Sequence, residues 1–179
     1  MKITILYSLL VMLISSCSSN TEQNKTLKAK EEQMNIFVKE LNDYPRSIQE
    51  IIISENQLIR NVSLGYSKEQ VRGVEKLNFT QSDEELHLLI AEGDLSDDIS
   101  LDVEYQFTQH KLSSISLIIY TTGKEQQTRT FENLKEILTK KFQLSPSVNN
   151  WFIENNTEIK ISKVGNEKEF DIELIFKLR

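Results

Sequence analysis

The feature that most restricts the fold is a strict alternation of apolar and polar side chains along residues 101–107, repeated along 170–178. The apolar members are Leu101, Val103, Tyr105 and Phe107 in the first stretch, and Phe170, Ile172, Leu174, Phe176 and Leu178 in the second. Successive side chains of a strand point to opposite faces of a sheet, so this period of two predicts strands with one buried and one wetter face. Such a sheet needs a second layer over its apolar side.

Short apolar segments bounded by turn residues predict the rest of the sheet. We expect further strands at 86–91, 112–120, 150–153 and 158–162. The apolar phase slips near Ser113 and Ser114, which predicts a bulge in the strand that contains them. Turns are expected at 108–111, 155–156 and 165–166, and such short connections force antiparallel pairing.

Two helices are predicted within the same region. Ser67 and Gln70 have the spacing of a capping box, in which each side chain accepts a hydrogen bond from the other residue's backbone N–H. Apolar residues between 131 and 142 recur at helical spacing and leave polar residues on the opposite side. The order of elements is therefore a helix, three strands, a helix and three strands.

This order predicts an α+β fold, a two-layer sandwich whose antiparallel sheet of about six strands has helices on one face. An amphipathic helical segment precedes it: Phe37 and Leu41 share one helical face, which ends near the turn at 42–45. The isoleucines at 48, 51, 52 and 53 favour a second helix over a strand. We expect four regions, a signal peptide (1–16), a lipidated flexible tether (17–30), the N-terminal helical segment (31–60) and the α+β domain (61–179).

The N-terminus has the pattern of a secretory signal. Lys2 is followed by a short apolar run over 3–14, then by Ser15 and Ser16, and then by Cys17, the single cysteine of the chain. This segment resembles the signal peptide and lipobox of bacterial lipoproteins. The resemblance implies a diacylglycerol thioether on Cys17, cleavage before it and acylation of the new N-terminus. The anchor would hold the protein stably at a membrane surface.

The N-terminal pattern has two other interpretations. A lone cysteine in an exported protein can be a free thiol or form an intermolecular disulfide. A membrane-spanning helix needs about 20 apolar residues, and this run has only about a dozen. The polar residues that follow predict a tether, of which about 12 residues reach about 40 Å when extended. Ser18 and Ser19 lack the aspartate of inner-membrane retention, which favours the outer membrane.

Composition excludes one class of partner. The chain has 39% hydrophobic and 27% charged residues, both ordinary for a globular domain, and a net charge of −6. Without a basic cluster, an acidic chain is a poor binder of nucleic acid, and anionic lipid headgroups should repel it. We therefore expect the lipid on Cys17 to hold the membrane, and another envelope protein to be the partner.

Several segments also resemble those of BamE-like and β-lactamase-inhibitor-like modules. They are the helix entry at 64–71, the Tyr105-x-Phe107 hairpin with Lys111-Leu112, and the closing helix end at 138–142 followed by Pro146 and Trp151. The resemblance implies a protein-binding module of an envelope lipoprotein, without catalysis. The chain departs from it at Gln143, where those modules usually carry glycine, and in a long acidic loop.

Two surfaces are candidates for binding a partner. Asp94, Asp97 and Asp98 belong to a carboxylate-rich stretch over 92–102, which we interpret as a solvated hairpin loop, with an acidic recognition surface as the alternative. Such a loop can also bind Ca²⁺, but the glycine and the closing glutamate of an EF-hand are not in register, so a solvated loop without metal is expected. Ile118 and Tyr120 should lie on the open face of the sheet as apolar points.

No residues form a recognisable catalytic set, so we expect no enzyme. His87 is placed on a strand and His110 in a turn, with no cysteine partner, and zinc or triad chemistry needs several convergent groups. Trp151 is expected in the core rather than at a binding hot spot. The sequence favours a non-catalytic adaptor lipoprotein. An immunity or inhibitor lipoprotein that neutralises a toxin or hydrolase in the envelope is the alternative, and the acidic charge would suit a basic toxin.

Overall fold

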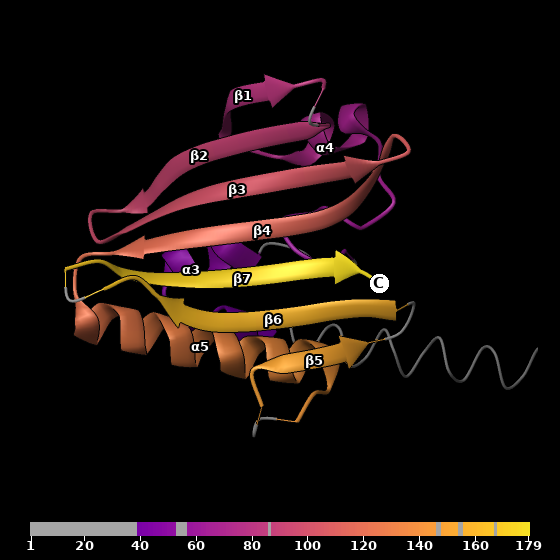
Figure 1. Cartoon of the computed structure of the whole chain (residues 1–179). Helices are drawn as coiled ribbons and strands as arrows, with labels where there is room; N and C mark the ends of the chain where they lie inside the picture. Colours follow the sequence, from indigo (N-terminus) through magenta and orange to yellow (C-terminus); the bar gives the residue numbers. More distant parts are fainter. Residues whose placement is uncertain (1–38, 53–56, 86, 146–147, 154–155, 167) are drawn as a thin grey trace, which may run out of the picture. The chain divides into compact units, whose positions relative to one another are not determined.

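The computed structural model describes residues 39–52, 57–85, 87–145, 148–153, 156–166 and 168–179. Residues 40–179 form one compact unit. The expectations for Cys17, for Phe37 and for Ile53 fall outside the described residues. Element labels follow Figure 1.

The unit contains one antiparallel sheet of seven strands in the order β1-β2-β3-β4-β7-β6-β5 (Figure 1). The strands are β1 (Asn78–Asp83), β2 (Leu88–Ser96), β3 (Ile99–Thr108), β4 (Lys111–Thr121), β5 (Asn150–Ile153), β6 (Thr157–Val164) and β7 (Phe170–Leu178). The α+β class and the antiparallel sheet are confirmed. The expected number of about six strands is wrong, because β1 was missed: Phe79 is the single apolar side chain in this edge strand, so no alternation marks it.

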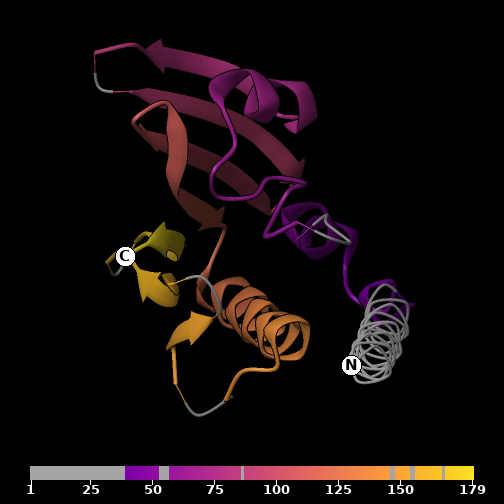
Figure 2. The same ribbon diagram turned by 90° about the vertical axis from the view of Figure 1, so that its right-hand side faces the viewer.

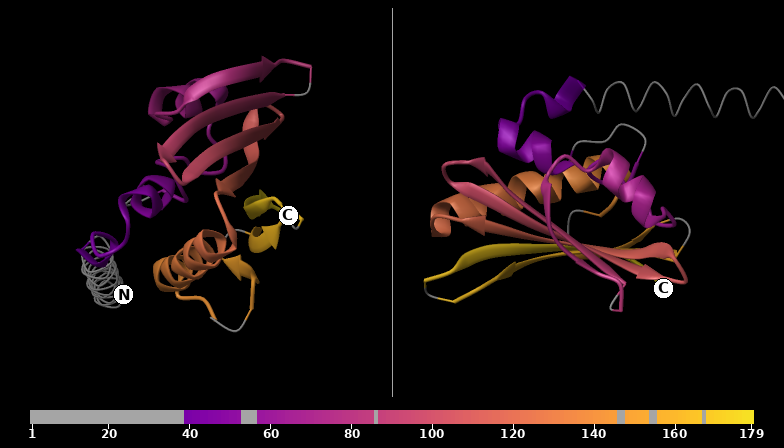
Figure 3. Two further views of the ribbon diagram at one scale, coloured as in Figure 1. Left: turned by 90° about the vertical axis from the view of Figure 1, so that its left-hand side faces the viewer. Right: turned by 90° about the horizontal axis from the view of Figure 1, so that it is seen from above.

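The helices α3 (Arg46–Ile52), α4 (Lys68–Val74) and α5 (Lys124–Phe142) lie on one face of the sheet (Figure 3, right). In Figure 2, α4 lies beside the β1–β2 end and α5 beside β6 and β7. On the covered face, Leu101, Val103 and Tyr105 of β3 and Leu174 and Phe176 of β7 are inaccessible to solvent. The period of two therefore correctly predicted which side of β3 and of β7 is buried, although Leu178 at the end of β7 is exposed.

Local signals at the helix ends were also correct in α4. The Ser67 N–H donates to Gln70 Oε1 at 2.9 Å, and the Gln70 N–H donates to Ser67 Oγ at 3.3 Å, which is the predicted capping box. At the end of α5, Gln143 adopts a left-handed conformation with φ 53°. This conformation is sterically unfavourable for a residue other than glycine.

The bulge in β4 and the role of Trp151 agree with expectation. Opposite β3, the pairing shifts between Gln106 and Phe107, whose partners are Ser114 and Leu112, so Ser113 is the extra residue. Trp151 is 4% exposed, and its indole N–H donates to the Ser145 carbonyl at 2.7 Å. The tryptophan is a core residue whose polar atom is satisfied inside the protein.

The long acidic loop over 92–102 does not exist. Glu92 and Asp94 belong to β2 and Asp102 belongs to β3, and only Asp97 and Asp98 form the turn between these strands. The alternation was hidden at Gly93, which faces the core opposite Leu101. A Cβ at Gly93 would lie 2.7 Å from Leu77 Cδ2, so the Leu77 side chain fills the space that an apolar residue would otherwise occupy.

Candidate functional site

The side of the sheet that faces away from α3, α4 and α5 is here called the open face (Figure 1, in which the strands lie in front of the helices). Residues paired directly across strands share a face. Ile118 of β4 pairs with Asp102 of β3 and with Glu173 of β7. Tyr120 pairs with Ser100 and with Asp171 in the same way. These pairings place both predicted apolar points on the open face.

The open face carries a small group of apolar side chains. Ile118 is half-buried, as are Ile90 of β2 and Ile175 of β7. Tyr120 is 38% exposed, which makes it one of the large apolar side chains that the described part of the chain presents to solvent.

Carboxylates surround these apolar side chains. The open face carries a group that we call the acidic patch, consisting of Glu92, Asp94, Asp102, Glu104, Asp171 and Glu173. Within the described ranges, the one ion pair of the acidic patch joins Glu173 to Lys160 at 3.8 Å. Glu92 and Asp102 lie directly opposite each other on β2 and β3, an arrangement of like charges that destabilises a sheet.

Tyr120 is sensitive to this negative charge. Its hydroxyl donates to Asp102 Oδ2 at 2.7 Å. That hydrogen bond, partial burial, and the charges of Asp102, Asp171 and Glu92 raise the pKa of Tyr120 to about 12. Burial, followed by the charge of Glu169, raises the pKa of Asp171 above its ordinary value. The open face is thus a region of negative potential in which a cation would be stabilised.

The structure brings the predicted site residues together. Asp94, Asp97, Asp98 and Tyr120 line one shallow depression of about 170 Å³ at the β2–β3 turn. Ile118 lies on β4 two residues before Tyr120. The aspartates and the apolar pair, predicted as two separate surfaces, are therefore neighbours on one.

A buried charged cluster was missed by the sequence analysis. Arg60 donates to Glu75 through Nε at 2.9 Å and through Nη2 at 2.6 Å, and Nη1 donates to the Glu50 carbonyl at 2.6 Å. The Tyr105 hydroxyl, from the core side of β3, also donates to the Glu75 carboxylate. The side chains of Arg60 and Glu75 are 4% and 0% exposed. The cluster therefore joins α3, the turn at residue 60, the end of α4 and the sheet.

Within this cluster, hydrogen bonds and opposite charges outweigh the effect of burial on the charged forms of Glu75 and Arg60. Burial alone would raise the pKa of Glu75, but the hydrogen bonds and charge of Arg60 outweigh it and hold that pKa below its ordinary value. Burial would lower the pKa of Arg60, and the bonds to Glu75 raise it instead. Burial and the Glu75 charge raise the pKa of Tyr105. Tyr105 itself was the available signal, because a phenol on the core side of a strand needs a partner.

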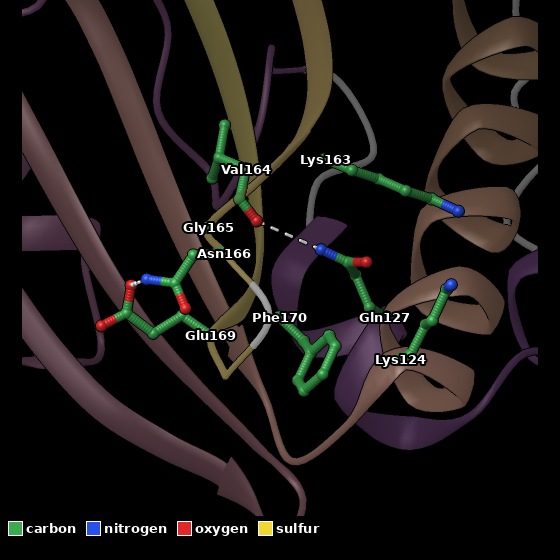
Figure 4. A pocket seen from close by; sticks show the side chains of 8 residues that line it. All are labelled: Lys124, Gln127, Lys163, Val164, Gly165, Asn166, Glu169 and Phe170. Atoms are coloured by element: carbon green, nitrogen blue, oxygen red, sulfur yellow. Dashed lines mark hydrogen bonds between the residues drawn. The ribbon is translucent and has the colours of Figure 1, made fainter.

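A larger open depression of about 490 Å³ lies on the helical side, between the start of α5 and the β6–β7 connection (Figure 4). Gln127 reaches from α5 to the Val164 carbonyl at 3.3 Å and to the Asp171 carbonyl at 2.7 Å. Lys163 donates to Thr128 at 3.2 Å, and Asn166 donates to Glu169 at 2.6 Å. The hydrogen bonds of Gln127 and Lys163 thus hold the adjoining ends of β6 and β7 against α5.

The two histidines lie close to each other, which the sequence did not suggest. Their ring centroids are 6.2 Å apart in an edge-to-face arrangement. His87 precedes β2 with φ 53°, so its expected position on a strand is wrong, whereas His110 lies in a turn as expected. They line a depression of about 280 Å³ that also contains Lys68, Glu69 and Glu84. Over the described residues, no three potential metal-ligating side chains converge.

Comparison with protein-family models, with curated proteins and with solved structures gave no match. Among the helices that can be described, none has the length and apolar character needed to cross a membrane.

Proposed function

We propose that this chain is a lipoprotein, anchored through Cys17 to the outer membrane of a bacterial cell envelope, that binds another envelope protein on its open face and catalyses no reaction. The signal-like N-terminus ending at Ser15-Ser16-Cys17 supports the anchor. The tether that follows would let the α+β domain reach a partner at some distance from the bilayer.

One observation carries the binding role. On the open face, Ile118 and Tyr120 lie on β4, the middle strand of the sheet, with carboxylates of the acidic patch on the neighbouring strands. A sheet face that only has to remain soluble needs polar residues but gains nothing from like charges placed opposite each other. Apolar side chains bordered by a polar rim are typical of protein interfaces.

An immunity or inhibitor lipoprotein remains the second candidate. The negative charge of the acidic patch, of which one carboxylate is ion-paired among the described residues, favours it, because an acidic surface speeds association with a basic toxin or hydrolase. The two roles differ in the partner: an adaptor binds a resident envelope protein, whereas an immunity protein binds one that arrives from outside.

The anchor is tested by Cys17→Ala. We expect the variant to leave the membrane fraction, as an unprocessed precursor or a soluble protein, because the lipid attachment atom Sγ is removed. Fractionation and intact-protein mass measurement follow the result, and Ser18→Ala serves as the matched control that keeps the lipid. If Cys17→Ala stays membrane-bound with the wild-type mass shift, the lipoprotein assignment is wrong.

The binding surface is tested with a photo-cross-linking amino acid at position 120 or 118 in the full-length protein, expressed in its native cells. We expect a discrete protein to be cross-linked from these positions and not from position 132, which is exposed on α5 at the other side of the sheet. Mass spectrometry identifies the product. A partner captured equally from position 132, or none from 118 and 120, would refute docking on the open face.

A further inference from the structure

We propose that the protein bound on the open face is a basic one, which places an apolar side chain over Ile118 and Tyr120 and lysine or arginine side chains on either side of it. This inference rests on the proposed function and specifies the chemistry of the partner. It is argued from the arrangement of charge on the open face.

The carboxylates of the acidic patch lie around Ile118 and Tyr120. In the pairing across the sheet, Ile118 has Asp102 on one side and Glu173 on the other, and Glu92 lies beyond Asp102. The row through Tyr120 continues to Asp171 on one side and through Ser100 to Asp94 on the other. Carboxylates therefore flank the apolar residues on both neighbouring strands.

Two lysines of this face lie on β6 and β7, outside the rows of Ile118 and Tyr120. Lys177 pairs with Ser114 of β4 and Glu158 of β6, and Lys160 pairs with Ile175. Lys160, one row from Ile118, lies 3.8 Å from Glu173. The paired positions in the rows of Ile118 and Tyr120 thus carry carboxylates and no lysine, so these two rows attract the positive side chains of a partner.

The spacing suits arginine or lysine side chains. Neighbouring strands lie about 4.8 Å apart, so Asp102 and Glu173 stand about that distance to either side of Ile118. Carboxylates at such positions accept charge-assisted hydrogen bonds from guanidinium or ammonium groups, and arginine can bind them with two bonds. Anionic lipid headgroups and nucleic acid carry the same sign of charge as the acidic patch and are disfavoured.

The protein cross-linked from position 120 supplies the probe. It is purified and titrated against the full-length chain, against the neutralised variant Asp102→Asn/Glu173→Gln, and against the control Glu125→Gln/Glu132→Gln, whose changes lie on exposed positions of α5. We expect the neutralised variant to bind about tenfold more weakly or worse, with slower association and a reduced salt dependence, while the control binds normally. The cross-linked peptide should be rich in lysine and arginine. Thermal unfolding verifies that both variants are folded.

The outcomes separate the two proposals. If a protein is cross-linked but binds the neutralised variant as tightly as the wild type, or its contact peptide lacks basic residues, the basic partner is refuted and docking on the open face stands. If the cross-linker attaches to lipid alone or to nothing, both proposals are refuted.

Discussion

Replacing Glu75 with glutamine is expected to lower the free energy of unfolding by about 3–5 kcal/mol, because it leaves the buried Arg60 guanidinium without a countercharge. Arg60 and Glu75 are joined by two hydrogen bonds and are almost completely removed from water. Arg60→Met should have an effect of the same order, since it leaves the carboxylate unpaired. Urea unfolding followed by circular dichroism measures both losses.

Two matched variants distinguish a charge effect from a simple loss of contacts. Tyr105→Phe removes one hydrogen bond to the Glu75 carboxylate and should cost only about 1.5–3 kcal/mol. The double variant Arg60→Met/Glu75→Leu removes both charges and should be more stable than either single variant. Single replacements that cost under about 1 kcal/mol would show that the cluster is not a charged pair in the folded protein.

The same cluster makes stability depend on pH. The folded pKa of Glu75 lies below its ordinary value of 4.5, so the contribution is fully present above that value and is lost as the pH falls below it toward the folded pKa. Between pH 7 and pH 3, wild-type protein should therefore lose more stability than Glu75→Gln. Equal losses would mean that Glu75 has the same pKa in the folded and unfolded chains.

A chain that begins at Asn61 is expected not to fold stably. It lacks Ile48, Ile51, Ile52 and Ile59, each at most 1% exposed, and burial of such a side chain contributes about 1.5–3 kcal/mol. It also lacks Arg60, so Glu75 would be buried without its partner. The combined loss approaches the roughly 5–15 kcal/mol by which a whole domain is stable.

The matched control is a chain that begins at Glu40, the first residue of the compact unit, and retains α3. It should unfold at nearly the same urea concentration as the mature protein. Circular dichroism and urea titration compare the two shortened chains. If the chain from Asn61 unfolds at the same midpoint as the chain from Glu40, α3 contributes nothing to stability, and the domain boundary predicted at residue 61 is the correct one for folding.

Local periodicity was sufficient for much of the fold. The alternation in β3 and β7 identified their buried sides, and the positions of Ser67 and Gln70 identified the start of α4. These features depend on residues within one or two turns of helix or along one strand, so the local sequence contains the information. β1 and the acidic part of β2 were missed, because polar residues suffice on an exposed edge or a wet face, and Leu77 replaces a side chain at Gly93.

The sequence by itself determined which residue types face the core, where α4 and α5 lie, and that Ile118 and Tyr120 share the wetter side of β4. Only the tertiary structure decided that Asp94, Asp97 and Asp98 lie beside Tyr120, and that Arg60 binds Glu75. Both results depend on strand order and on contacts between residues distant in the chain. No local period encodes such contacts, because the free energy that forms them is gained only when separate elements pack together.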